Sequence, residues 1–409
     1  MQIRGKALVF FAGTFLVNLL LVGHFFFTRS TTTTTTTRPT CRERAAAGEN
    51  VLLEAVLKRD DRTGFTKDLI VERGWNHAKS DVFDDLADIT FRTVSGRCDV
   101  DYGMVSAIEG KHGGATIVLL KNSACMCSLL DPAQRQVLSP SALILVLGPF
   151  GDGDNFGSFS SVENSFVKNV VWGKRIRREC KSQYDVDAAL RTFLNDSRLV
   201  AWVSIAGGLN HPKILYYPIG FNKVFWEAVR EQGVPKKEDF IAVTWRYPLP
   251  AKYSDFRDRV YEHISNRFPN RFTTSPIDPF KDKRLRKEER WKLATEQFIR
   301  AKLIPAPAGL GAATKRPMEA ILTGGVGIVS VDAGDLSTWY GLPVIYVNDM
   351  LNLPSADVLN EAYLDAVCDV SKRKFEMLTS RGWIDYLTKL AKPASAELRE
   401  LYARSYLII

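Results

Sequence analysis

Residues 296–349 read EQFIRAKLIPAPAGLGAATKRPMEAILTGGVGIVSVDAGDLSTWYGLPVIYVND. A loop rich in glycine, alanine and proline (305–313) precedes a helix whose first turn suits Pro317, because the N–H that proline lacks has no partner there. Gly324 and Gly325 end this helix, and an apolar strand follows directly. The order of loop, helix and strand predicts one unit of a parallel α/β sheet.

Apolar runs of strand length recur through the rest of the chain. They lie at 115–120, 142–147, 200–205, 240–244, 327–331 and 343–347. Continuous apolar runs of this length are typical of strands that are buried on both faces. Helical patterns lie between them, at 187–195, 253–268, 290–301 and 315–323. Strands that alternate with helices predict an α/β fold with parallel sheets.

The length of 409 residues is enough for two or three domains. Glycine, proline and lysine break the pattern at 222–238, so we place a domain boundary there. The expected parts are an N-terminal domain at 51–230, a C-terminal domain at 231–382 and a terminal helix at 383–409. Hydrophobic residues make up 45% and charged residues 25% of the chain, which excludes a disordered, collagen-like or multi-span membrane protein.

The first fifty residues are typical of a membrane anchor and a stem. Residues 7–27 are almost all apolar, and about 20 apolar residues in a helix cross a bilayer. The basic tail at 1–6 would stay in the cytosol, and the threonine-rich stretch at 28–50 cannot bury a core. This layout predicts a single-pass type II protein of the Golgi or ER membrane with a lumenal domain. The alternative is a cleaved signal peptide, whose apolar region is usually shorter, at about 7–15 residues.

The formal net charge of +9 permits a nucleic acid as a partner but does not require one. Much of the excess lies in the tail and stem and in two basic stretches, 174–181 and 281–292. Charge runs of this kind are usually solvated faces, so we expect no nucleic-acid partner.

The six cysteines show no paired C-x-x-C spacing, which argues against a structural zinc site. They are Cys41, Cys98, Cys125, Cys127, Cys180 and Cys368. In a lumenal compartment some of them can form disulfides, but the sequence leaves the pairing open. Asn195 begins the one N-glycosylation sequon of the chain.

The region around residue 316 has the features of a phosphate site. A helix N-terminus offers free N–H groups and a partial positive charge. Gly309 and Gly311 would let the backbone approach a ligand closely, and Lys315 and Arg316 would add charge-assisted hydrogen bonds. Glu319, one turn into the helix, would accept hydrogen bonds from ribose hydroxyls. Ligands of open α/β sheets bind at the carboxyl ends of the strands, where this loop is expected.

The same region resembles the donor-binding core of the exostosin-like glycosyltransferases. The resemblance is carried by R-x-x-E-A-I-x-x-G-G-x-G-I-V at 316–329, W-Y-x-L-P-V at 339–344 and the pair Asn348-Asp349. A second match, HPKI at 211–214 with PIG at 218–220, resembles the segment that closes the first domain of that family. The resemblance is close at 296–349 and thin over the rest of 140–350.

The resemblance implies a GT-B fold, in which two Rossmann-like domains face a cleft and the second domain holds a nucleotide-sugar donor. The implied activity is transfer of a sugar to a glycan or glycoprotein, with the catalytic domain in the lumen. Arg246 follows the strand at 240–244 and would contact the donor diphosphate. The candidate donor-binding residues are thus Arg246, Gly309, Gly311, Thr314, Lys315, Arg316 and Glu319.

The sequence departs from the family pattern in the donor loop. The family's Ser-Pro-Arg-Gly is Ala-Pro-Ala-Gly at 306–309, so the loop arginine is replaced by Ala308. The family's aspartate and histidine positions hold Ala313 and Lys315. These differences motivate a second hypothesis, a catalytically inactive membrane-tethered protein that binds glycans or nucleotides.

Asp152 and Asp154 follow the strand at 142–147 and are the candidate catalytic residues. An inverting transferase needs a general base for the acceptor hydroxyl, and a carboxylate at the end of a strand suits that role. The same Asp-x-Asp spacing also fits a GT-A transferase that holds Mn²⁺ with such a pair. The spacing recurs at 99–101 and 185–187, so it is not specific. We expect no required metal and no cofactor, since the nucleotide sugar is a substrate.

Overall fold

The computed structural model describes residues 39–70, 83, 86–94, 97–100, 114–121, 125–131, 143–147, 186–204, 213–218, 220, 223–245, 256–274, 286–307, 315–330, 339 and 341–392. The expected tail and anchor, residues 1–27, lie outside this set. Within it, no helix has the length and apolar character needed to span a membrane.

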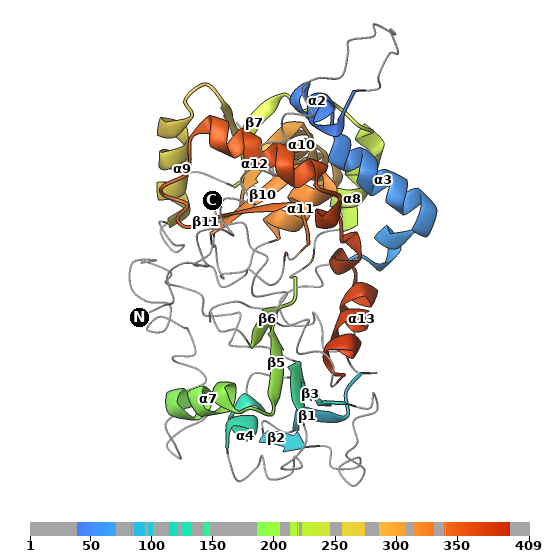
Figure 1. The fold of residues 1–409 in the computed structure, drawn as a ribbon, viewed down its shortest axis with the longest axis vertical. Helices are drawn as coiled ribbons and strands as arrows, with labels where there is room; N and C mark the ends of the chain where they lie inside the picture. The colour runs from blue at the N-terminus through green and yellow to red at the C-terminus, as the bar shows by residue number, and fades with distance from the viewer. Residues whose placement is uncertain are drawn as a thin grey trace, which may run out of the picture. The chain divides into compact units, whose positions relative to one another are not determined.

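The C-terminal half contains a parallel sheet of five strands (Figure 1). The strands are β7 (Asp239–Val243), β8 (Phe272–Thr274), β9 (Ala301–Pro305), β10 (Val326–Ser330) and β11 (Val344–Val347). Their order is β11-β10-β9-β7-β8, and each neighbouring pair runs parallel. The helices of this part are α8 (Lys223–Gln232), α9 (Phe256–Arg267), α10 (Lys287–Arg300), α11 (Arg316–Leu322) and α12 (Ala356–Cys368). The expected alternation of strands and helices is confirmed here.

A second sheet of six strands lies in the N-terminal half. Its strands are β1 (Ile89–Val94), β2 (Arg97–Val100), β3 (Thr116–Leu120), β4 (Ile144–Leu147), β5 (Leu199–Ser204) and β6 (Ile214–Tyr216), with α4 (Met126–Leu130) and α7 (Val186–Asn195). The order is β2-β1-β3-β4-β5-β6, and only the β1–β2 pair among these is antiparallel. The prediction of an α/β fold with parallel sheets is therefore correct for both halves.

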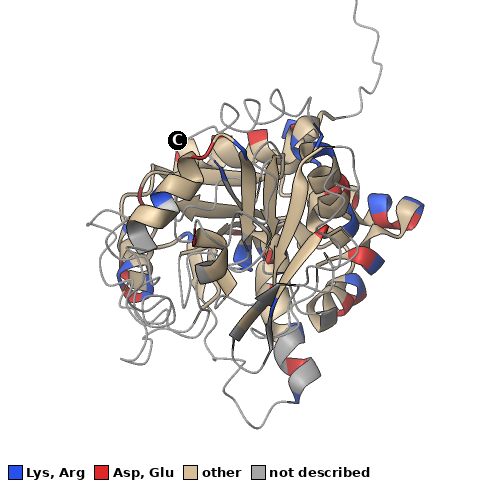
Figure 2. Ribbon diagram, turned by 90° about the horizontal axis from the view of Figure 1, so that it is seen from below, with Lys and Arg blue, Asp and Glu red and all other residues tan. Residues whose placement is uncertain are grey.

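Both sheets are built from strands with apolar side chains. β3, β4 and β11 are buried along their whole lengths, as expected for strands covered on both faces. Charged positions lie mostly on the helices, whereas the strands are largely uncharged (Figure 2). The strands that the sequence did not predict either have only three residues, as β6 and β8 do, or contain charged residues, as β1, β2 and β9 do.

The compact unit begins at Cys41, ten residues before the boundary that we expected between stem and domain. Helix α2 (Cys41–Ala46) occupies part of the stretch assigned to the stem, because its end and the next helix bury apolar side chains. Helix α3 (Val51–Thr63) lies in the range expected for the N-terminal domain but contacts α11 and α12, so it packs on helices of the C-terminal half (Figure 1).

The chain also returns from the C-terminal half to the N-terminal sheet. Helix α13 (Ser380–Leu390) begins three residues before the expected terminal helix, after 3-10 turns at Val370–Lys372 and Phe375–Leu378. The amide of Ala115 at the start of β3 donates to the carbonyl of Ala391, 2.7 Å away. The ring centroids of Trp383 and Tyr217 are 5.3 Å apart, and the two rings pack edge to face. A third 3-10 turn, Phe65–Asp68, follows α3.

A buried polar junction fastens α3 to the C-terminal sheet. Lys237 is fully buried, and its Nζ donates to the carbonyls of Ala301 (2.8 Å) and Thr323 (3.0 Å). Asn50, the N-cap of α3, donates from Nδ2 to the same Thr323 carbonyl over 3.1 Å. Burial lowers the pKa of Lys237 well below its usual value. The carbonyl of Thr323 thus receives donors from two distant parts of the chain.

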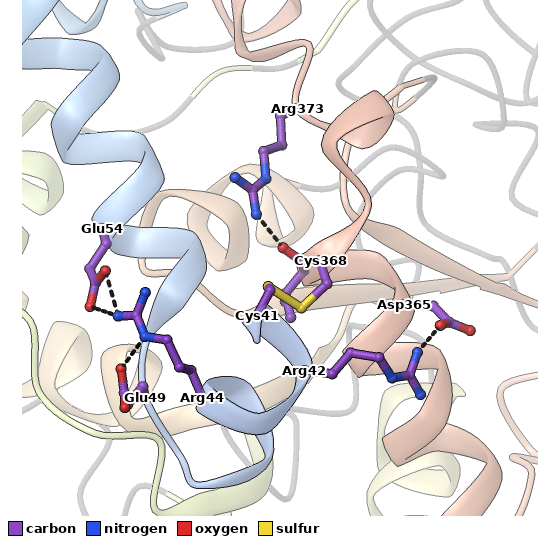
Figure 3. The surroundings of a disulfide bond; sticks show 9 residues. Cys41, Arg42, Arg44, Glu49, Glu54, Asp365, Cys368 and Arg373 are labelled. Carbon is purple, nitrogen blue, oxygen red and sulfur yellow. Dashed lines mark hydrogen bonds and ion pairs between the residues drawn. A yellow bond between two sulfur atoms is a disulfide. The ribbon is translucent and has the colours of Figure 1, made fainter. Parts of the chain in front are cut away.

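A disulfide between Cys41 and Cys368 joins α2 to the end of α12 (Figure 3). Arg42 forms ion pairs with Glu361 and Asp365 of α12 beside this bond. A second disulfide, Cys98–Cys125, joins β2 to the residue before α4. The sequence left the pairing of the cysteines open, and the structure pairs these four residues.

The substitution Lys237→Ala should lower the free energy of unfolding by about 2–4 kcal/mol, since it leaves a cavity and deprives two buried carbonyls of a donor. The neighbouring Lys236 is exposed, so Lys236→Ala is the matched control and should change stability little. Denaturant titrations of both variants measure the difference. Equal effects of the two substitutions would refute the role of the junction.

Replacement of Cys41 and Cys368 by serine should destabilise the protein by about 2–4 kcal/mol, because the bond closes a long loop in the unfolded chain. Each single substitution already breaks the bond, so C41S and C368S should each match the double variant. Thermal unfolding of the three variants measures this. Additive losses would show that the cysteines stabilise the fold separately and not as a pair.

Candidate functional site

The start of α11 lies over the carboxyl end of β7. Nη2 of Arg316, the first residue of α11, donates to the carbonyl of Thr244 over 3.0 Å. Thr244 directly follows β7, and β9 is the parallel neighbour of β7 in the sheet. The chain leaves β9, passes residues 308–314 and enters α11, so these groups gather at one edge of the sheet. This is the edge at which open α/β sheets bind ligands.

The glycines of the G-G-x-G motif bring α11 close to its neighbours. A Cβ atom on Gly327 of β10 would lie 2.9 Å from Cα of Pro317, too close for a real side chain. Gly324 has φ of 76°, and a Cβ there would lie 1.8 Å from Oδ1 of Asn50. Only glycine fits both positions, which fixes the distance between helix and strand. The motif therefore positions α11 and need not touch a ligand itself.

A buried carboxylate orients the basic residues of this helix. Glu319 has a fully buried side chain and forms an ion pair with Arg316, whose side chain is 13% exposed. Nζ of Lys315 lies 3.9 Å from Oε1 of the same carboxylate. The guanidinium of Arg316 also lies over the ring of Phe298, 5.3 Å from its centroid. These contacts hold Arg316 in one orientation at the end of β7.

A third basic residue, Arg257, lies near Arg316 at this edge and was not predicted from the sequence. It lies in the first turn of α9, and its Nη2 donates to the carbonyl of Pro307 over 3.4 Å. Burial, and secondly the nearby charge of Arg316, lower the pKa of Arg257 to about 10. Its guanidinium is still protonated at neutral pH. A basic residue in the first turn of a helix is unfavourable for the helix dipole, and this is the sequence signal that could have marked it.

Three polar atoms at this edge have no hydrogen-bond partner among the described residues. They are Oγ1 of Thr244, Nε1 of Trp245 and Oε1 of Glu319. Thr244 is 8% exposed and Glu319 fully buried, so water does not replace the missing bonds freely. Buried polar atoms are rarely left unpaired in proteins, and sites that hold ligands are one place where they occur. The charged residues at the same edge are Arg257, Lys315, Arg316 and Glu319, and we call these four residues the basic cluster.

The structure brings together Lys315, Arg316 and Glu319 of the predicted donor-binding residues. Six other candidates lie outside the described residues, and their roles stay predictions. They are Asp152, Asp154, Arg246, Gly309, Gly311 and Thr314. In the described ranges, no group of three His, Cys, Asp or Glu side chains could hold a metal ion.

Helix α11 itself contributes less to anion binding than the sequence suggested. It has seven residues, and Pro317 in its first turn has no N–H group to donate. The positive charge at this edge therefore comes mainly from side chains.

Comparison of the chain with models of known protein families gives no match, and comparison with curated protein sequences gives none either.

The substitution Glu319→Ala should lower the free energy of unfolding by about 3 kcal/mol, because it removes the carboxylate that pairs with the largely buried guanidinium of Arg316. Glu319→Gln keeps an acceptor for Arg316 and should cost less. Glu231 of α8 is exposed, so Glu231→Ala is the control on another helix. Urea titrations compare the three variants. A loss from Glu319→Ala no larger than that from Glu231→Ala would exclude the carboxylate as the group that holds Arg316.

Proposed function

We propose that this protein is a membrane-anchored glycosyltransferase of the GT-B fold. It would bind the diphosphate of a nucleotide-sugar donor at the basic cluster and move the sugar to a glycan or glycoprotein acceptor. The observation that supports this most is the convergence of Arg257, Lys315 and Arg316 at the carboxyl edge of β7 and β9. Charge-assisted hydrogen bonds from such groups suit phosphate oxygens.

The basic cluster fits the chemistry of the reaction. Glycosyl transfer breaks the bond between the anomeric carbon and the diphosphate oxygen, so negative charge grows on the leaving diphosphate. Fixed cations at that place stabilise the transition state more than the ground state. Oε1 of Glu319, which has no hydrogen-bond partner among the described residues, is an acceptor for a ligand hydroxyl. In an inverting reaction, Asp152 or Asp154 would take the proton of the acceptor hydroxyl.

The two disulfides support a lumenal location for this activity. Cys41–Cys368 and Cys98–Cys125 lie in different parts of the fold. Disulfides persist in the secretory pathway and are rare in the cytosol. They agree with a type II protein of the Golgi or ER membrane, anchored by residues 7–27.

A second candidate is a catalytically inactive protein that binds a nucleotide or glycan through the same edge. One observation favours it: the guanidinium of Arg316 already donates to Glu319 and to the Thr244 carbonyl, so part of its capacity is used within the fold. Ala308, which replaces the loop arginine of the family pattern, also favours this candidate. The metal-dependent GT-A reading rests on the Asp-x-Asp spacing alone.

The test is donor turnover by the full-length chain, purified in detergent and assayed with UDP-, GDP- and CMP-sugars in EDTA. At least one donor should be hydrolysed or its sugar transferred without a metal, and Arg257→Ala should lower kcat/KM about tenfold or more, since it removes one charge-assisted contact. Arg267 lies exposed at the other end of α9, so Arg267→Ala is the matched control.

Calorimetric titration with UDP, GDP and CMP separates the alternatives. Nucleotide binding that Arg257→Ala weakens, without any turnover, supports the inactive protein. Strict dependence on Mn²⁺ supports the GT-A reading. If no nucleotide binds and neither Arg257→Ala nor Arg316→Ala changes any signal, the proposal is wrong.

A further inference from the structure

A cavity of 390 Å³ opens at the amino edge of the C-terminal sheet. Its walls include Asp239, the first residue of β7, together with Arg271 and Thr273 at the start of β8 and Lys302 at the start of β9. Small-molecule sites usually fall between about 300 and 1,000 Å³, so the cavity is large enough for a small ligand. β7 has five residues and is about 16 Å long, which separates this cavity from the basic cluster at the opposite edge.

Two cations in the cavity wall are held by neutral groups. Nζ of Lys302 donates to Oδ1 of Asn360 over 3.4 Å and lies 5.6 Å from the ring centroid of Tyr363. The guanidinium of Arg271 lies over the ring of Phe240, 4.7 Å from its centroid. No ion pair of either residue occurs among the described residues, although the carboxylate of Asp239 lines the same cavity. A cation over an aromatic ring keeps its positive charge.

These two cations lie close enough to repel one another. The pKa of Lys302 is lowered by its burial and, secondly, by the charge of Arg271. Lys302 is half-buried and Arg271 is exposed, so the repulsion acts mainly on the charge of Lys302, and an anion between the two groups would relieve it. The nearby pair of Glu238 and Arg300 does not supply that anion, because its own two charges are matched across 3.1 Å.

Another wall of the cavity is fastened by a hydrogen bond and a disulfide. Gly48, in the turn between α2 and α3, accepts a hydrogen bond from the amide of Lys237 over 2.7 Å. A Cβ on Gly48 would lie 3.0 Å from the carbonyl oxygen of Lys237, and its φ is 84°. The Cys41–Cys368 bond fastens the same segment to α12, which also carries Asn360 and Tyr363. The turn and Lys302 are therefore both held by α12, whereas Arg271 is held by Phe240 of β7.

We propose that this cavity binds a small oxyanion, with its phosphate or carboxylate group between Arg271 and Lys302. This is a second ligand site, independent of the proposed donor site, and a diphosphate bound at one edge of the sheet cannot reach the other. Asp239 sets the selectivity: its carboxylate disfavours ligands with high negative charge and favours those that carry a hydrogen-bond donor next to the anionic group.

The test uses calorimetric titration of the full-length chain with two probes, inorganic phosphate and citrate, which distinguish a phosphate from a carboxylate ligand. At least one should bind with a saturating isotherm in the wild type and in Arg257→Ala, which weakens only the donor site. Arg271→Ala and Lys302→Met should each weaken this binding about tenfold, because each removes one charge-assisted contact. Lys302→Met keeps the alkyl stem on Tyr363, and Arg271→Lys should restore part of the affinity.

Two further variants make the outcome decisive. Asp239→Asn should tighten binding, since it removes a negative charge beside the anion, and Arg267→Ala should leave it unchanged. Circular dichroism checks that each variant is folded. Binding that is lost in Arg257→Ala but kept in Arg271→Ala and Lys302→Met would place the oxyanion at the donor edge and overturn the proposal. Absence of saturable binding of both probes would overturn it too, whatever the result for nucleotides.

Discussion

The buried carboxylate of Glu319 is the constraint on which the candidate site depends. A charge without access to water must be compensated within the fold, and Arg316 and Lys315 do this. Because Arg316 also donates to the Thr244 carbonyl, the same interaction fixes the start of α11 to the end of β7. Gly327 permits this position, since any side chain there would collide with Pro317. The ion pairs of Glu319 and the close packing at Gly327 therefore both position α11.

The other end of α11 is held by a different polar arrangement. The carbonyl of Thr323, directly after the helix, accepts from both Asn50 and Lys237. A helix of seven residues has little stability of its own, so its geometry comes from these distant partners. Separate parts of the molecule therefore hold its two ends. The charged groups at the carboxyl edge of the sheet hold the first end, and Asn50 and Lys237, which precede α3 and β7, hold the second.

Much of the fold followed from the sequence because local pattern determines it. Apolar runs and helical spacing predicted six strands and four helices close to their observed bounds, and the glycines after α11 marked its end. The packing of α3 on α11 and α12 was missed, since Asn50 contacts Thr323 across 273 residues and no periodicity indicates such a contact. Arg257 was missed for the same reason. It belongs to the basic cluster only because β7 and β9 are neighbours in the sheet.

The Cys41–Cys368 bond has a consequence for the integrity of the molecule. It encloses both sheets within one covalent ring, whose two cysteines are 327 positions apart in the sequence. A protease that cuts a surface loop anywhere inside this ring produces a nicked chain and not two fragments. The pieces stay linked until a reductant reaches the sulfurs, and each cut end stays near its original neighbours. A single cleavage in an oxidising compartment would therefore leave the ring's architecture assembled.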